Sequence, residues 1–273
     1  MSSVPVLLSI AGSDPSGGAG IQADLKTFTA HHTYGATVVT ALTAQNTVGV
    51  SGVHAAPPGF VRQQLDDVVG DLNVDAAKTG MLVDAPTIAA VVDGLQAAFL
   101  RRRFALVVDP VLISKSGHAL LADDAVETMR SRLLPLASLV TPNLPEAARL
   151  VGFPVVTTDD AVRAGRALLD AGAQAALVKG GHGDGDVVHD LLVMTDGVVD
   201  IASPRVQTRH THGTGCTLSA AIAARLGRGL PLVDAVRGAV AWVHDAIVQA
   251  PGLGAGHGPL NHLHDLVVRS EAP

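Results

Sequence analysis

The chain has 273 residues, with 25 acidic and 19 basic side chains and a formal net charge of −6. Hydrophobic residues make up 48% and charged residues only 16%, which excludes a disordered chain and is typical of a globular α/β protein whose strands are covered on both faces. The acidic charge, with no basic cluster beyond residues 101–103, argues against nucleic-acid binding, and no apolar run reaches the roughly 20 residues of a membrane helix.

The chain contains one cysteine, which excludes an intramolecular disulfide and indicates a reducing compartment. Its first residues lead into an apolar stretch without the basic region of a signal peptide. We therefore expect a cytoplasmic protein that is not associated with a membrane.

The first part of the chain alternates short apolar strands with helices. We expect strands at 4–11, 36–44, 50–54 and 75–78, and helices at 21–31, 57–70 and 85–100. The same alternation continues with strands at 105–108, 138–140 and 175–178, and helices at 122–133, 144–151 and 159–171. This order predicts parallel strands joined by right-handed helical crossovers.

The last part of the chain departs from that alternation. An Asp-Gly turn at 196–197 separates two apolar runs, 187–193 and 198–201, and predicts a hairpin. Helices are expected at 217–226 and 232–249, followed by a glycine-rich loop at 252–258 that is a candidate lid or nucleotide-edge loop. Because no repeat and no linker interrupts the chain, we predict one domain over residues 1–273.

Polar, glycine-rich clusters follow nearly every expected strand. They lie at 12–18, 45–46, 78–81, 109–111, 141–143 and 179–182. Ligands bind at the carboxyl ends of the strands in open α/β sheets, so we expect these clusters to converge on one crevice.

The stretch Thr208–Ala221 contains Gly-Thr-Gly-Cys at 213–216. Gly213 and Gly215 can adopt conformations closed to other residues, and the apolar run after Cys216 indicates a helix, so the loop presents N–H groups at a helix N-terminus. Such a site binds anions, and the helix dipole favours a thiolate, so we expect a lowered pKa for Cys216. Free cysteine is more often a small buried hydrophobe, but the preceding loop favours a chemical role.

Oxygen-bearing side chains at two strand ends suggest a magnesium site. Asp109, Asn143 and Glu146 are the candidates, because Mg²⁺ needs only one or two carboxylates beside substrate phosphates. Glu146 could equally serve the start of its helix. Lys179 enters Gly-Gly at the ligand edge, which favours phosphate contact over a surface position.

Other patterns carry weaker signals. Residues 18–23 match the dinucleotide fingerprint, but no acidic residue follows at the ribose distance and no Gly-Lys-Ser/Thr forms a P-loop. Asp24 is explained by placement near a helix start, and Gln45 and Asn46 suit either a strand-end turn or the reading of a heterocycle. Twelve histidines lack the partners of a zinc site.

The quoted clusters together resemble the hydroxymethylpyrimidine/phosphomethylpyrimidine kinases of thiamine biosynthesis. The matching segments are SIAGSDPSGGAGIQAD at 9–24, TAQN at 43–46, KTGM at 78–81, DPV at 109–111, TPN at 141–143, KGGH at 179–182, HTHGTGC at 210–216 and GPLNH at 258–262. They run in collinear order over the whole chain.

The resemblance implies a ribokinase-like three-layer α/β/α fold, with a central, mostly parallel sheet, active as a homodimer. It implies that ATP phosphorylates 4-amino-5-hydroxymethyl-2-methylpyrimidine and then its monophosphate, with Mg²⁺. By analogy, Gln45 reads the pyrimidine. Around the ring lie Gly12, Asp24, Met81 and Val111.

The resemblance also places the phosphate-binding and catalytic groups. Lys179 and Asn143 contact the ATP phosphates, while Asp109 and Glu146 act through magnesium and its waters. The N–H groups of Gly213, Thr214, Gly215 and Cys216 hold the transferring phosphoryl group, and Cys216 accepts or orients the proton of the substrate hydroxyl.

Cys216 stands where most ribokinase relatives carry an aspartate base, which argues against a sugar kinase. Two alternatives stay open. One is a pyridoxal kinase of the same fold, and the other is a non-catalytic sensor that binds a pyrimidine or nucleotide.

Overall fold

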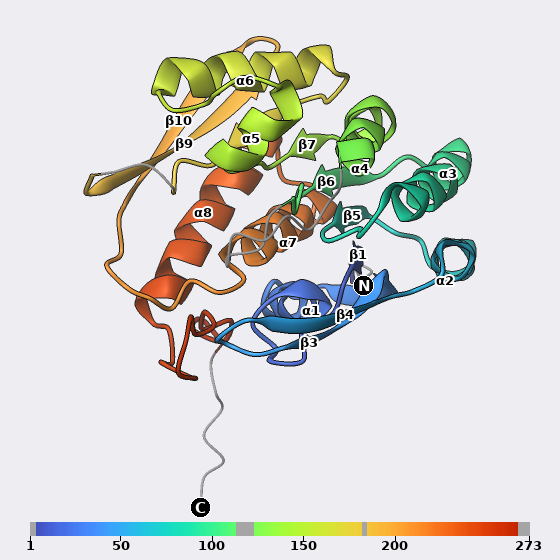
Figure 1. Cartoon of the computed structure of the whole chain (residues 1–273), viewed down its shortest axis with the longest axis horizontal. Coiled ribbons are helices and arrows are strands. Elements are labelled where there is room, and N and C mark those ends of the chain that lie inside the picture. The colour runs from blue at the N-terminus through green and yellow to red at the C-terminus, as the bar shows by residue number, and fades with distance from the viewer. Residues whose placement is uncertain (1–3, 113–122, 182–184, 267–273) are drawn as a thin grey trace, which may run out of the picture.

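An eight-stranded sheet forms the centre of the protein (Figure 1). Its strands are β1 (Val6–Ala11), β2 (Tyr34–Val39), β5 (Ala76–Thr79), β6 (Ala105–Val108), β7 (Leu139–Val140), β8 (Ala176–Val178), β9 (Val187–Met194) and β10 (Gly197–Pro204). Their order is β10-β9-β8-β7-β6-β5-β1-β2. All neighbours are parallel except β8–β9 and β9–β10, which are antiparallel. The computed structural model describes residues 4–112, 123–181 and 185–266.

Helices cover both faces of this sheet (Figure 1). One face carries α1 (Gly20–Ala30), α7 (Thr214–Gly227) and α8 (Leu232–Val248). The other carries α2 (Pro58–Asp71), α3 (Ala85–Arg101), α4 (Asp123–Thr128), α5 (Leu144–Val151) and α6 (Thr158–Asp170). Successive strand residues alternate between the two cores: Leu7 packs with α7 and α8, and Leu8 packs with α2 and α3. The predicted three-layer, mostly parallel α/β fold is confirmed.

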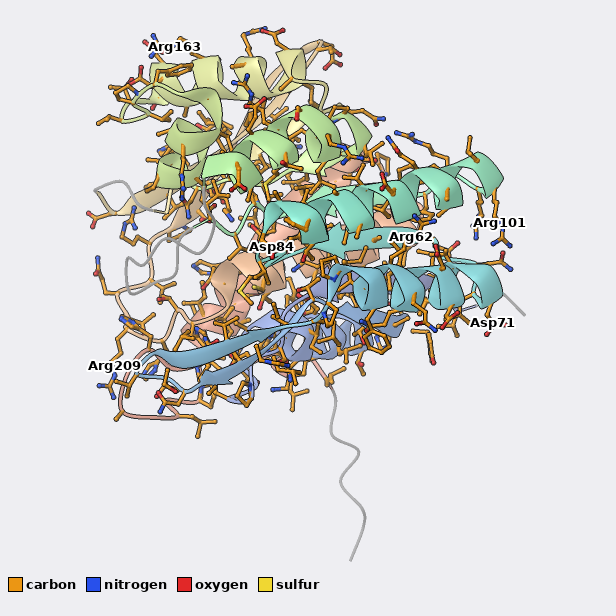
Figure 2. The ribbon with its side chains drawn as sticks, turned by 45° about the vertical axis from the view of Figure 1, so that its right-hand side comes forward. Arg62, Asp71, Asp84, Arg101, Arg163 and Arg209 are labelled. Carbon is orange, nitrogen blue, oxygen red and sulfur yellow. The ribbon has the colours of Figure 1, made fainter. Side chains whose placement is uncertain are left out.

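Local chemistry sets several helix starts. The Asp84 side chain accepts a hydrogen bond from the backbone N–H of Thr87 and begins α3, beside α2 (Figure 2). A reciprocal capping box between Thr157 and Asp160 begins α6. The helix predicted at 122–133 is α4 followed by a π-helical turn, Met129–Leu133; residue 122 lies outside the described residues. None of the described helices is both long enough and apolar enough to span a bilayer.

The strand predicted at 36–44 is wrong as a single element. The chain leaves the central sheet after β2, and β3 (Ala41–Gln45) pairs with β4 (Val50–Ala55) in a separate hairpin. Thr40 is the point of departure: its N–H donates to the Ala11 carbonyl (3.0 Å) and its hydroxyl to the Met81 carbonyl (2.6 Å). These bonds direct the chain across the ligand edge, so Gln45 lies on the hairpin instead of ending a strand of the main sheet.

The hairpin tip meets the glycine-rich loop at 252–258. The Thr47 carbonyl accepts from the His257 N–H (2.8 Å), and the His257 ring contacts the Arg209 carbonyl (3.0 Å). Figure 2 shows the blue hairpin reaching the end of the molecule marked by Arg209. The candidate lid loop is therefore packed against the hairpin.

Candidate active site

Loops after five parallel strands meet at one edge of the sheet, as the cluster positions predict. These strands are β1, β5, β6, β7 and β8. A Cβ atom added to Gly12 would lie 2.5 Å from the Met81 Cε, so the loops after β1 and β5 touch. Asn143 and Lys179 form an isolated bridge between the loops after β7 and β8.

Gly213 begins α7 in a left-handed conformation, with φ of +79°. A Cβ atom there would lie 1.8 Å from the Gly18 carbonyl oxygen, so this position needs glycine for both its backbone angle and its close approach. Thr214, Gly215 and Cys216 form the first turn of α7, where backbone N–H groups have no intrahelical acceptor. The predicted helix N-terminus is therefore present, three residues earlier than expected.

Half-buried Lys179 and buried Asp109 form an ion pair beside this turn. The Lys179 Nζ lies 3.1 Å from the Asp109 Oδ1, which also accepts from the Thr141 hydroxyl (3.3 Å). A Cβ atom on Gly215 would lie 3.3 Å from the Lys179 Nζ, so the glycine brings the α7 backbone against the pair. Burial lowers the pKa of Lys179, but the Asp109 and Glu146 carboxylates raise it above its ordinary value, so the ammonium stays charged.

Glu146 caps the start of α5 and also lies among the charged groups at the sheet edge, and its magnesium role stays a prediction. It completes a capping box with Asn143: the Glu146 N–H donates to the Asn143 side chain (2.9 Å), and the Glu146 carboxylate accepts from the Asn143 N–H (2.9 Å). It is also buried near Lys179 and Asp109. Burial raises the pKa of Glu146 to about 7; Lys179 opposes this rise, whereas the Asp109 carboxylate adds to it.

The expected thiolate at Cys216 is wrong for this structure. Burial raises the pKa of the thiol to about 11, because removing a charge from water outweighs the lowering by Lys78 and by a hydrogen bond from the Gly20 N–H. Asp24 and Asp109 raise it further. Cys216 lies in the first turn of α7 and is half-buried, and here the cost of burying the charge outweighs the stabilisation of a thiolate by the helix N-terminus.

Asp24 lies beneath the edge, without exposed surface. Its Oδ2 contacts the Lys78 Nζ (3.2 Å) and accepts from the Ser9 hydroxyl. Burial raises the pKa of Asp24, while Lys78 opposes this rise; the same attraction raises the pKa of Lys78 above its ordinary value. The Asp24 Oδ1 has no hydrogen-bond partner among the described residues. Its substrate role stays a prediction.

Gln45 and Val111 approach the edge from different directions. Gln45 lies on β3, where its amide contacts the Thr43 hydroxyl (3.3 Å) and the His212 ring (3.4 Å). Val111 follows Asp109, and its N–H donates to the Asp109 carbonyl (2.9 Å). Their roles as substrate contacts also stay predictions.

Asp14 and His212 are two site residues that sequence reasoning missed. The His212 Nε2 lies 2.7 Å from the Asp14 Oδ2, and this carboxylate also accepts from the N–H groups of Ser16, Gly18 and Ala19. Asp-Pro-Ser-Gly and His-Gly were visible in the sequence, but nothing local showed that loops about 200 residues apart would meet. Lys78 was likewise seen only as part of a motif.

Comparisons with known proteins identify the family of the chain. The family model described as phosphomethylpyrimidine kinase matches residues 14–261. The chain belongs to the phosphomethylpyrimidine kinase family.

Members and structural neighbours of the phosphomethylpyrimidine kinase family resemble the chain over most of its length. A hydroxymethylpyrimidine/phosphomethylpyrimidine kinase of Rhizobium meliloti is 50% identical, with 95% of this chain and 97% of the relative covered. The crystal structure of a phosphomethylpyrimidine kinase from Clostridium difficile 630 is 40% identical with a TM-score of 0.78, covering 90% of this chain and 100% of that one. An ADP complex of Bacillus subtilis pyridoxal kinase is 34% identical with a TM-score of 0.89, covering 96% and 98%.

Proposed function

We propose that the protein transfers the γ-phosphoryl group of ATP to 4-amino-5-hydroxymethyl-2-methylpyrimidine, and then phosphorylates the monophosphate to the diphosphate, in thiamine biosynthesis. Family membership at 50% identity supports this activity. The observation that carries it is the meeting of Lys179, Asp109 and the Gly213–Cys216 turn at one sheet edge. We also propose a cytoplasmic homodimer, from the family resemblance; light scattering of the purified protein tests the dimer.

Phosphoryl transfer requires that the substrate hydroxyl and the γ-phosphoryl group are positioned together and that the phosphate charge is neutralised. The substrate hydroxyl oxygen forms a bond to the γ-phosphorus, the bond from that phosphorus to the ADP oxygen breaks, and the hydroxyl proton leaves. Backbone N–H groups at the start of α7 point at developing phosphoryl charge, and Lys179 supplies a fixed positive charge. Asn143, beside Lys179, completes the proposed phosphate contacts.

Cys216 orients the hydroxyl in this scheme. Because the raised pKa keeps the thiol protonated at neutral pH, the thiol positions the attacking oxygen but does not accept its proton, which passes to an oxygen of the transferred phosphoryl group as the new bond forms. Phosphoryl transfer through a loose transition state needs little prior deprotonation, so a neutral thiol is compatible with it.

Mg²⁺ fits the two buried carboxylates, Asp109 and Glu146. Within the described ranges, no group of three or more His, Cys, Asp or Glu side chains forms a metal site. Two carboxylates suffice for Mg²⁺ beside phosphates, and the raised pKa of Glu146 marks a place where added positive charge stabilises the carboxylate. When bound, the ion neutralises phosphate charge.

An assay coupling ADP release to the pyrimidine alcohol tests the proposal, with the monophosphate as the substrate for the second step. Pyridoxal is the second candidate substrate, because the pyridoxal kinase fold matches with a TM-score of 0.89. A larger kcat/KM for the pyrimidine alcohol than for pyridoxal supports the proposal, and the reverse order replaces it. If neither the pyrimidine alcohol nor pyridoxal causes ADP release, the protein is better explained as a non-catalytic sensor.

A further inference from the structure

Three side chains from distant loops meet beside the proposed substrate position. Asp14 follows β1, Gln45 lies on β3, and His212 directly precedes the Gly213 turn. The His212 Nε2 is 2.7 Å from the Asp14 Oδ2 and 3.4 Å from the amide end of Gln45. Asp14 is 1% exposed.

The protonation of this cluster follows from Asp14. Burial alone raises the pKa of Asp14, but hydrogen bonds from His212 and Ser16 lower it to about 2, so the carboxylate is ionised and can only accept. The His212 Nε2 must therefore carry the hydrogen that it shares with Asp14. A ring nitrogen that donates cannot also accept from a Gln45 N–H.

The Gln45 amide must consequently turn its oxygen, not its NH₂ group, toward His212, where at 3.4 Å it shares the single Nε2 hydrogen that points mainly to Asp14. A half turn of an amide exchanges its oxygen and nitrogen at almost no change in shape, so hydrogen-bond partners decide the orientation. The Gln45 nitrogen then faces the Thr43 hydroxyl (3.3 Å), which itself donates to the Ser13 carbonyl (3.0 Å) and can accept. The His212 Nε2–H, the Gln45 NH₂ group and the Thr43 hydroxyl then each face a hydrogen-bond acceptor.

We propose that His212 is a specificity-determining positioning residue, which Asp14 holds in place and which fixes the end of the Gln45 amide that faces the substrate ring. The inference rests on the proposed function of Gln45 as the group that reads the pyrimidine. An aminopyrimidine edge presents an N–H donor beside a ring-nitrogen acceptor, so only one order of amide oxygen and nitrogen matches it. Pyridoxal has no amino group beside a ring nitrogen, so it gains less from this order.

The surroundings of His212 hold its ring firmly. A Cβ atom on Gly18 would lie 2.6 Å from the His212 Cδ2, and the His212 N–H donates to the Gly258 carbonyl (3.1 Å). The residue that orients Gln45 is thus adjacent in the chain to the phosphoryl-binding turn, and both share the Gly18 loop as a wall.

Two variants distinguish the effect of the His212 Nε2 donor from the effect of its ring. His212→Phe keeps a ring but removes the Nε2 donor, and His212→Gln supplies an amide donor at a similar reach. We expect His212→Phe to raise KM for the pyrimidine alcohol by about tenfold or more, because the half-buried Gln45 amide loses its fixed partner, while KM for ATP and the kinetics with pyridoxal change little. His212→Gln should recover most of the lost preference for the pyrimidine.

The control is His189→Phe, which breaks a histidine–aspartate pair of the same kind, 2.9 Å from Asp200, on the exposed face of β9. It should leave both substrates unaffected. An equal loss of kcat with both substrates and an unchanged preference in His212→Phe would mean that the residue only supports the loop, and would overturn the proposal.

A readout without turnover keeps the inference separate from the proposed function. The side-chain NH₂ signals of Gln45, assigned by NMR with Gln45→Glu, should shift and exchange faster with solvent in His212→Phe but not in His212→Gln. Unchanged signals refute the orienting contact even if the enzyme is active. If the signals shift but the protein does not phosphorylate the pyrimidine, the substrate assignment is refuted. His212 would then orient the Gln45 amide without determining substrate specificity.

Discussion

Replacing Gly213 with alanine is expected to lower both the stability of the protein and its kcat. Two features of the structure act at this position. The backbone has φ of +79°, and the new Cβ atom would lie 1.8 Å from the Gly18 carbonyl oxygen. The loop after β1 and the start of α7 are therefore forced apart.

The magnitude follows from these two features. A left-handed backbone costs a non-glycine residue about 1–2 kcal/mol, and relief of the overlap costs about 1–3 kcal/mol more, so the free energy of unfolding should fall by about 2–5 kcal/mol. Moving the Cβ to the shortest tolerated contact of 3.0 Å requires a displacement of about 1.2 Å. A shift of about 1 Å in catalytic groups can reduce kcat by about 100-fold.

Gly152→Ala is the matched control. Gly152 ends α5 with φ of +78°, but a Cβ atom there meets nothing within 4 Å, so this variant carries the backbone strain without the overlap. Urea denaturation should show a loss of about 1–2 kcal/mol for Gly152→Ala, with wild-type kcat in the coupled ADP assay. Equal stability losses in the two variants, together with wild-type kcat in Gly213→Ala, would refute the reasoning.

Three further predictions concern buried charge. Cys216→Ala should lower kcat while ADP binding, measured by calorimetry, is kept; wild-type turnover of this variant would remove the thiol from the mechanism. The wild-type thiol should react slowly with iodoacetamide until the pH approaches 11. Glu146 keeps its proton to about pH 7 in the metal-free fold, so its contribution to the free energy of unfolding is complete below pH 4.5 and is lost as the pH rises through about 7. In urea titrations, Glu146→Gln should reduce this decline in the free energy of unfolding by up to about 3 kcal/mol. The exposed Glu127→Gln should not reduce it. Lys78→Met leaves Asp24 buried without its partner and should lower the free energy of unfolding by about 3–5 kcal/mol. Adding Asp24→Asn to the same chain should recover part of this loss. A loss below about 1 kcal/mol for Lys78→Met would contradict a functional ion pair.

Much of the fold could be predicted from local patterns. Short apolar runs separated by amphipathic stretches predict the parallel strands and the helices, and the glycines and acids after each strand predict the ligand edge. These signals are local because they arise from side-chain periodicity and from capping, as at Asn143 and Glu146. The assignment of residues 1–273 to one domain stays a prediction.

Thr40 shows where local patterns fail. Residues 36–44 have the composition of one strand, yet hydrogen bonds to Ala11 and Met81 divide them between two sheets. The partners of Thr40 are remote in sequence, so no periodicity within the segment reveals the break.

Motifs and periodicity in the chain were enough to predict the family, the parallel α/β architecture and the set of polar groups at the carboxyl edge. The protonation of Cys216 and the contact of His212 with Asp14 and Gln45 could be found only in the folded protein. A pKa depends on how much water and which charges surround a group, and the orientation of an amide depends on its neighbours in space. Both are properties of burial and of contacts between distant segments, which exist only after the chain has folded.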